Sequence, residues 1–163
     1  MFYASLTPIA RAGVAAIAVV SMSSLAFAGN TTQVKTPLGK EITAQVVKAP
    51  AADTPEYSII DSIKMLSKGN MDGWMTKWCY KPRCETPEAI DRLKAYTLSS
   101  ATKNASKCLF DGDSIYVTNR KENAKVTPPE TKIFTYCGDD RMPVPTSLRK
   151  LDDGSWKIST LSF

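Results

Sequence analysis

The hydrophobic period of the chain changes near Ser106, and this change constrains the fold more than any other feature. Upstream, apolar residues such as Ile59, Ile60, Ile63 and Leu66 recur at spacings of three and four, which is typical of an amphipathic helix. Downstream, apolar and polar residues alternate between turn residues, which is typical of antiparallel strands. The order predicts an α+β fold in which three N-terminal helices pack on one face of an antiparallel sheet of about five strands.

The helix starts carry a repeated signal. Thr54-Pro55-Glu56 and Thr86-Pro87-Glu88 each offer a capping hydroxyl, a proline suited to the first helical position and an acid near the helix N-terminus. A second, short helix is expected over residues 71–79, and the third helix is expected to fray over residues 98–103. The predicted inward face of the third helix consists of Ile90, Leu93, Tyr96 and Thr97.

The closing hairpin is the strongest short-range signal in the sequence. Its Asp152-Asp153-Gly154 turn lies between two runs that can alternate apolar and polar side chains. A three-residue loop with Gly154 in the left-handed conformation pairs Leu148 with Ile158. In the same register the stem of Lys150 lies on Trp156. A two-residue loop would split the apolar residues between the two faces, so we predict the three-residue register.

The first 28 residues have the layout of a secretory signal peptide, with Arg11, an apolar run and the ending Ala26-Phe27-Ala28. The apolar run is shorter than the roughly 20 residues of a spanning helix, which disfavours a membrane anchor. Composition predicts a flexible N-terminal arm over residues 29–52, with a short edge strand over Glu41–Lys48 as the structured alternative. The folded domain is expected over residues 53–163. The mature protein is expected to be periplasmic or extracellular and to lack a transmembrane segment.

Four cysteines follow the predicted leader. In an oxidising compartment they indicate two disulfides, for which three connectivities are possible. Cys79 with Cys84 and Cys108 with Cys137 is the first choice, because the first pair brackets a short turn that contains proline. A zinc site built from all four cysteines is the rival interpretation, and it lacks the second close pair that such sites have.

Composition disfavours several functions. The chain has 21 Lys and Arg against 16 Asp and Glu, and removal of Arg11 with the leader would leave a net charge of +4. Because these charges are mixed along the chain, we expect no nucleic-acid partner. The chain has no histidine, which disfavours the usual catalytic triads and most zinc or iron sites. Its aspartate-rich segments have the composition of tight turns, so we expect no metal and no cofactor.

The chain resembles the nuclear transport factor 2-like superfamily over residues 54–163. The likeness rests on the opening helix, on the Lys68-Gly69-Asn70-Met71-Asp72-Gly73-Trp74 break and on residues 148–158, which are similar to a terminal strand pair of secreted members. The resemblance implies a cone in which a strongly bent sheet wraps over the helices and encloses a pocket. The alternative is that large side chains fill this space as core. The candidate pocket walls are Ile63, Trp74, Trp78, Tyr96, Tyr116, Phe134, Tyr136 and Trp156.

The superfamily contains both enzymes and binding modules, so the fold does not define the activity. Its steroid-isomerase-like members use an acid and a tyrosine inside the cone, but Asp61 and Asp91 are expected on outward, solvated helix faces. We therefore expect an exported, non-catalytic binding or assembly module for a small apolar ligand or an envelope protein partner. The alternative is an isomerase- or cyclase-like enzyme that acts in the cone. A homodimer through the exposed sheet face is a further expected assembly.

Overall fold

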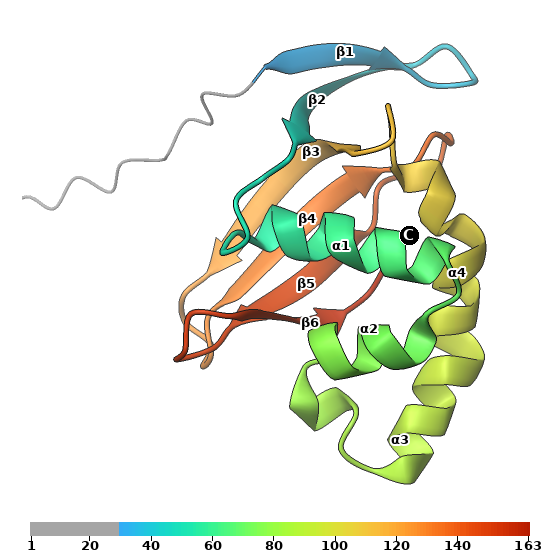
Figure 1. Ribbon diagram of the computed structural model, residues 1–163. Helices are drawn as coiled ribbons and strands as arrows, with labels where there is room; N and C mark the ends of the chain where they lie inside the picture. Colours follow the sequence, from blue (N-terminus) through green and yellow to red (C-terminus); the bar gives the residue numbers. More distant parts are fainter. Residues whose placement is uncertain (1–29) are drawn as a thin grey trace, which may run out of the picture.

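The computed structural model describes residues 30–163, so the predicted signal peptide lies outside the described residues. One antiparallel sheet has the strand order β1-β2-β3-β4-β5-β6, in which each strand pairs with its neighbours in sequence (Figure 1). The strands are β1 (Thr31–Lys35), β2 (Glu41–Lys48), β3 (Ser114–Asn123), β4 (Glu130–Tyr136), β5 (Pro145–Lys150) and β6 (Trp156–Thr160).

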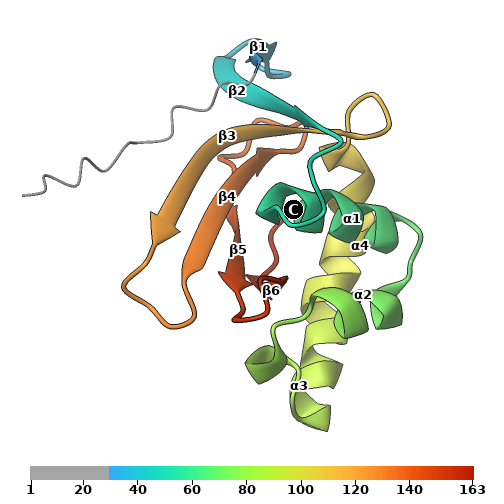
Figure 2. The same cartoon turned by 60° about the vertical axis from the view of Figure 1, so that its left-hand side comes forward.

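The helices lie between β2 and β3 in the chain and cover one face of the sheet (Figures 1 and 2). No helix in residues 30–163 is long and apolar enough to cross a membrane. The helical elements are α1 (Pro55–Ser67), α2 (Met71–Trp78), η1 (Lys81–Arg83), α3 (Pro87–Arg92), η2 (Leu93–Leu98), α4 (Ser99–Ala105) and η3 (Ser106–Cys108).

The α+β class is observed, but the predicted arrangement of elements is wrong. The sheet has six strands instead of about five, and the helices are not N-terminal, because β1 and β2 precede them. These two strands lie within residues 29–52, the segment predicted to be a flexible arm. Ala44 of β2 is buried, and the end of β2 pairs with the start of β3, for example Gln45 with Val117. The strand proposed over Glu41–Lys48 is therefore present, but it is not an edge strand, because it pairs with both β1 and β3. β1 was not predicted.

The predicted helix caps are confirmed. The Thr54 hydroxyl accepts a hydrogen bond from the backbone N–H of Tyr57 at 3.3 Å, and the Thr86 hydroxyl accepts one from Ala89 at 3.2 Å. Each hydroxyl satisfies one of the backbone donors that lack a partner in the first turn of a helix. Local sequence therefore determines where α1 and α3 begin.

The third helix differs from its predicted form. It does not fray after Leu98, because η2 continues it into α4, and η2 is a π-helical segment. A π-helical turn holds more residues than an α-helical turn. Residues at α-helical spacing therefore do not all lie on the same face of this segment. Leu93 and Leu98 are buried, whereas Tyr96, predicted to face inward, is 75% exposed.

The closing hairpin has the predicted register. Leu148 pairs with Ile158 and Lys150 with Trp156, and Gly154 has a φ of 81°. The Lys150 ammonium lies 5.6 Å from the centre of the Trp156 ring. Leu148 and Ile158 therefore lie together in the core between the sheet and the helices.

Both disulfides have the first-choice pairing. Cys79 is bonded to Cys84, and Cys108 is bonded to Cys137. The first disulfide encloses η1. The second joins η3 to the residue that follows β4, so it fastens the end of the helical segment to the sheet.

Candidate functional site

The three tryptophans proposed as pocket walls lie in the hydrophobic core. Trp74, Trp78 and Trp156 are 1%, 6% and 9% exposed. Each indole N–H has an acceptor: Trp74 donates to the Ser62 hydroxyl, Trp78 to Asp61 Oδ2 at 2.7 Å and Trp156 to the Asp53 carbonyl at 2.9 Å. Buried, hydrogen-bonded indoles contribute to packing. Ile63 is likewise fully buried in this core.

Three other proposed pocket walls, Tyr116, Phe134 and Tyr136, lie on the opposite face of the sheet. Ile115 and Val117 belong to the core, so Tyr116 between them points away from the helices. Tyr136 is paired with Tyr116 across the strands and shares its face. Phe134, two residues before Tyr136, shares this face as well. With Tyr96 exposed on η2, the predicted walls do not converge on one pocket.

The two carboxylates considered for catalysis have different surroundings. Asp91 is exposed, as predicted. Asp61 differs from the prediction, because its side chain is only 25% exposed. It accepts from the Trp78 indole and forms an ion pair with Lys77 at 3.0 Å. Both donors belong to α2, so they hold Asp61 against this helix.

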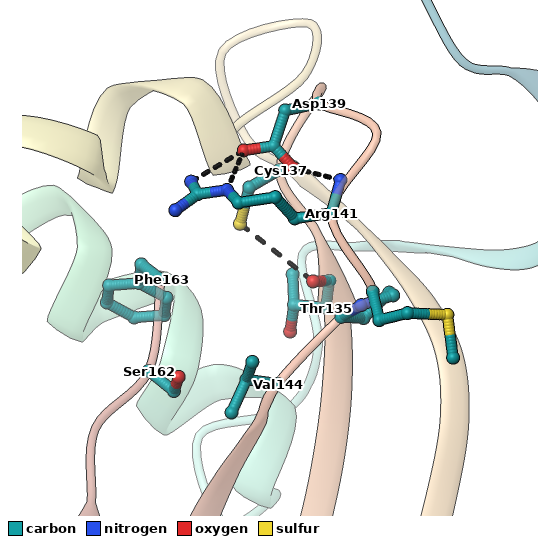
Figure 3. A pocket seen from close by; sticks show the side chains of 9 residues that line it. Thr135, Cys137, Asp139, Arg141, Val144, Ser162 and Phe163 are labelled. Carbon is teal, nitrogen blue, oxygen red and sulfur yellow. Dashed lines mark hydrogen bonds and ion pairs between the residues drawn. The ribbon is translucent and has the colours of Figure 1, made fainter. Parts of the chain in front are cut away.

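A cavity of about 150 Å³ is present where β4 ends, beside the C-terminal segment. Figure 3 shows Thr135, Val144, Ser162 and Phe163 around one space, with Asp139 and Arg141 paired beside it. Two separate stretches of chain, residues 135–144 and 162–163, therefore form this site. The lining residues are Thr135, Cys137, Asp139, Arg141, Met142, Pro143, Val144, Ser162 and Phe163.

Thr135 gives the cavity one polar group without a partner. The residue is 4% exposed, and its hydroxyl oxygen forms no hydrogen bond within the described part of the chain. A buried hydroxyl left without a partner costs roughly 1–3 kcal/mol. An occupant of the cavity that hydrogen-bonds to Thr135 would remove this cost.

The loop that covers the cavity is held by local contacts. Arg141 donates from Nε to Asp139 Oδ2 at 2.7 Å and from its backbone N–H to Asp139 Oδ1 at 3.1 Å. The hydrogen bond from the Arg141 side chain is the main reason that the pKa of Asp139 is below its usual range. Together with the disulfide at Cys137, these contacts preorganise the loop between β4 and β5.

Exposed apolar side chains gather around this loop. Met142 is 77% exposed and Val144 is 60% exposed, and both line the cavity. Leu38, at the turn between β1 and β2, is 84% exposed. Its backbone N–H donates to Asp140 Oδ1 at 2.9 Å, which fastens this turn to the loop between β4 and β5. We call Leu38, Met142 and Val144 the apolar end surface.

The aspartates in the turns make structural contacts. Asp113 forms an ion pair with Lys64, and Asp153 accepts from the backbone N–H of Ser155 at 2.8 Å. No group of three His, Cys, Asp or Glu side chains in residues 30–163 is placed to hold a metal ion. These contacts are what tight turns require.

Tyr136 supports a prediction about pH. Burial raises the pKa of its phenol, and the negative charges of Asp140 and Asp139 raise it further. The folded state therefore favours the neutral phenol. The resulting stabilisation is complete below the ordinary tyrosine pKa of about 10 and is lost as the pH rises through the raised value. Melting temperatures measured between pH 9 and about 11.5 should fall more steeply for the wild type than for Tyr136→Phe.

The matched control is Tyr96→Phe, because the Tyr96 ring is 75% exposed. This variant should follow the wild-type pH profile. Equal alkaline slopes for the wild type and Tyr136→Phe would contradict the assigned environment of Tyr136.

The residues that line this cavity are not among the pocket walls predicted from the sequence. The available signal was the placement of Met142 and Val144 between turn residues and prolines, in a loop where large apolar side chains have no local packing role. Leu38 has the same signal, because it lies in a turn between Pro37 and Gly39. Thr135 had no signal, since its unpaired hydroxyl follows from tertiary packing.

The fold and the site define a disulfide-linked α+β domain with a meandering six-stranded sheet and a small cavity beside an apolar surface. Comparison with protein-family models, curated proteins and solved structures gives no match for this chain. The resemblance to the nuclear transport factor 2-like superfamily therefore stays a prediction.

Proposed function

We propose that the protein is an exported, non-catalytic binding module that docks a protein partner of the cell envelope on the apolar end surface. One observation carries the proposal. The large apolar side chains that are exposed in residues 30–163 are Leu38, Tyr96, Met142 and Val144. Met142 and Val144 line one cavity, and Leu38 lies in the turn that is hydrogen-bonded to the same loop through Asp140. Clustered exposed apolar side chains mark interaction sites, whereas scattered ones do not.

The size of the cavity favours one anchoring side chain over a whole small ligand. Pockets for small molecules usually measure about 300–1,000 Å³, and this one measures about 150 Å³. An apolar cavity of about 150 Å³ accommodates a benzene ring. A partner's tyrosine fits best, because its ring would fill the cavity and its hydroxyl would bond to Thr135.

Several further observations support the proposal. The hypothesis of an enzyme loses support because tryptophans occupy the space between the sheet and the helices. In addition, Asp61 is already bonded to the Trp78 indole and the Lys77 ammonium. Dimerisation through the sheet face has less support, because Tyr116 is covered by the stacked ring of Phe110 at 4.2 Å. The two disulfides support export, since disulfides persist in oxidising compartments.

The test is affinity purification of the mature protein from envelope extract of its own host, followed by a binding assay with the recovered partner. Met142→Glu should weaken that partner's binding at least about tenfold, because a charge would face an apolar contact. The melting temperature should hardly change, since Met142 is 77% exposed. Tyr96→Glu is the matched control and should bind as the wild type does.

Thr135→Val tests the cavity itself. Valine has nearly the same shape, so the free domain should be equally stable or more stable than the wild type. Binding of the partner should weaken, because the hydroxyl contact is lost. A partner bound equally well by the wild type, Met142→Glu and Thr135→Val would overturn the proposal.

A further inference from the structure

A second concave surface lies beside the outer edge of β6. It consists of a hollow of about 90 Å³ against the end of β6 and an open hollow of about 570 Å³ beside α3 and η2. The two hollows share Arg83, Leu93 and Thr97, so they lie side by side on one surface. We call this surface the edge groove. In both views α3 lies at the end of the molecule away from the β1–β2 hairpin that carries Leu38 (Figures 1 and 2).

One wall of the edge groove is a strand edge. β6 is the last strand of the sheet, and its outer edge is bridged at Ile158 by Cys79, with the Tyr80 N–H donating to the Ile158 carbonyl at 3.0 Å. Beyond Ile158, residues 159–161 line the groove. No strand in residues 30–163 pairs with this part of the edge. An unpaired strand edge can accept an added strand through backbone hydrogen bonds.

The opposite wall is helical and partly apolar. Leu93 is 8% exposed and contributes apolar surface, whereas the ring of Tyr96 is 75% exposed at the open end. The π-helical form of η2 accounts for this arrangement, because it buries Leu93 and turns Tyr96 outward. π-Helical turns are frequent at functional sites.

Two arginines give the groove positive charge that is unpaired within residues 30–163. Arg83 and Arg92 both line it, and neither side chain forms a hydrogen bond or ion pair with another residue in the described part of the chain. Glu85, Glu88 and Asp91 are exposed nearby but do not line the groove. A guanidinium group binds a carboxylate through two parallel hydrogen bonds. The Cys79–Cys84 disulfide closes the short loop that carries Arg83 and so limits its motion.

We propose that the edge groove binds an extended, acidic segment of a partner protein. The segment adds as a strand beside residues 159–161, and its carboxylates pair with Arg83 and Arg92. Backbone pairing supplies affinity, and the arginines select acidic side chains. This site uses different elements from the apolar end surface, and its existence does not depend on the proposed function.

The test uses the mature protein and a short peptide that alternates valine with glutamate, compared with a peptide in which glutamine replaces glutamate. Fluorescence anisotropy should show binding of the glutamate peptide only. Arg83→Glu/Arg92→Glu should weaken this binding at least about tenfold. Hydrogen exchange of the Thr160 and Leu161 amides should slow when the peptide binds. Both arginines are exposed, so the double variant should fold normally.

The control for net charge is Lys103→Glu/Lys125→Glu, which makes the same charge change at exposed positions outside the groove. This variant and Met142→Glu should bind the peptide as the wild type does. An equal loss in the lysine variant, or equal binding of the glutamine peptide, would overturn the proposal. A further result would overturn the proposal. If acetate or phosphate shifted the NMR signals of the Arg83 and Arg92 side chains, but the peptide did not slow hydrogen exchange at residues 159–161, the groove would hold only a small anion.

Discussion

Trp74→Ala is expected to lower the free energy of unfolding by about 3–5 kcal/mol, as large aromatic-to-alanine changes in a core do. Trp74 is 1% exposed and belongs to the core cluster that also contains Trp78 and Ile158. The substitution leaves a cavity between α2 and the sheet. It also removes the donor that bonds to the buried Ser62 hydroxyl. Urea denaturation followed by circular dichroism measures the change.

The control for Trp74→Ala is Tyr96→Ala, which removes an exposed aromatic ring and should change stability by no more than about 0.5 kcal/mol. Loss of less than about 1 kcal/mol in Trp74→Ala would show that the space between the sheet and the helices is not packed as described.

Removing the Cys108–Cys137 disulfide is expected to destabilise the domain by about 3.6 kcal/mol, against about 2.1 kcal/mol for the Cys79–Cys84 disulfide, by the loop-closure estimate. The difference arises because the Cys108–Cys137 disulfide spans 29 residues, whereas the Cys79–Cys84 disulfide spans only 5. A longer loop loses more chain entropy in the unfolded state when it is closed. Double-alanine variants of each pair, compared in urea denaturation, measure the two losses.

Non-reducing peptide mapping of the wild type supplies the control for the disulfide comparison. It should recover Cys79 linked to Cys84 and Cys108 linked to Cys137. A larger loss for the short loop than for the long one would contradict the loop-entropy account. Any other pairing in the peptide map would contradict the structure at both disulfides.

Features set by neighbouring residues could be predicted from the sequence. The caps at Thr54 and Thr86 depend on side chains that reach a backbone N–H three residues away. The register of the closing hairpin follows from Gly154 and from the apolar residues on both sides of the turn. In each case the deciding contact is short-range, so a local pattern contains the necessary information.

Features that depend on distant segments could not be predicted. The strand over Glu41–Lys48 was expected at the edge of the sheet, but β2 is interior because it also pairs with β3, which follows the whole helical region. The orientation of Tyr96 depends on the π-helical turn, and Tyr116 lies on the face of the sheet away from the helices because Ile115 and Val117 take the core positions. An alternating pattern predicts two faces of a strand but does not show which of two apolar faces meets the helices.

The candidate site depends almost entirely on contacts between distant segments, so it was the hardest feature to predict from the sequence. Its cavity is formed by the end of β4, the loop that follows and the C-terminal Phe163, and these segments meet only in the folded domain. The hydroxyl of Thr135 lacks a partner because of this packing. The exposed Leu38, Met142 and Val144 had a signal in the sequence, as apolar residues in turn segments.

The connection of β2 to β3 also affects when the apolar end surface is completed during folding. Their pairing joins Gln45 to Val117, so it must close a long loop, whereas β3 to β6 assemble between sequence neighbours. Contacts between distant residues form more slowly than local ones. The β1–β2 hairpin should therefore join the sheet late in folding. Because this hairpin carries Leu38, the apolar end surface is complete only in the finished domain, and a partly folded chain would not yet present it.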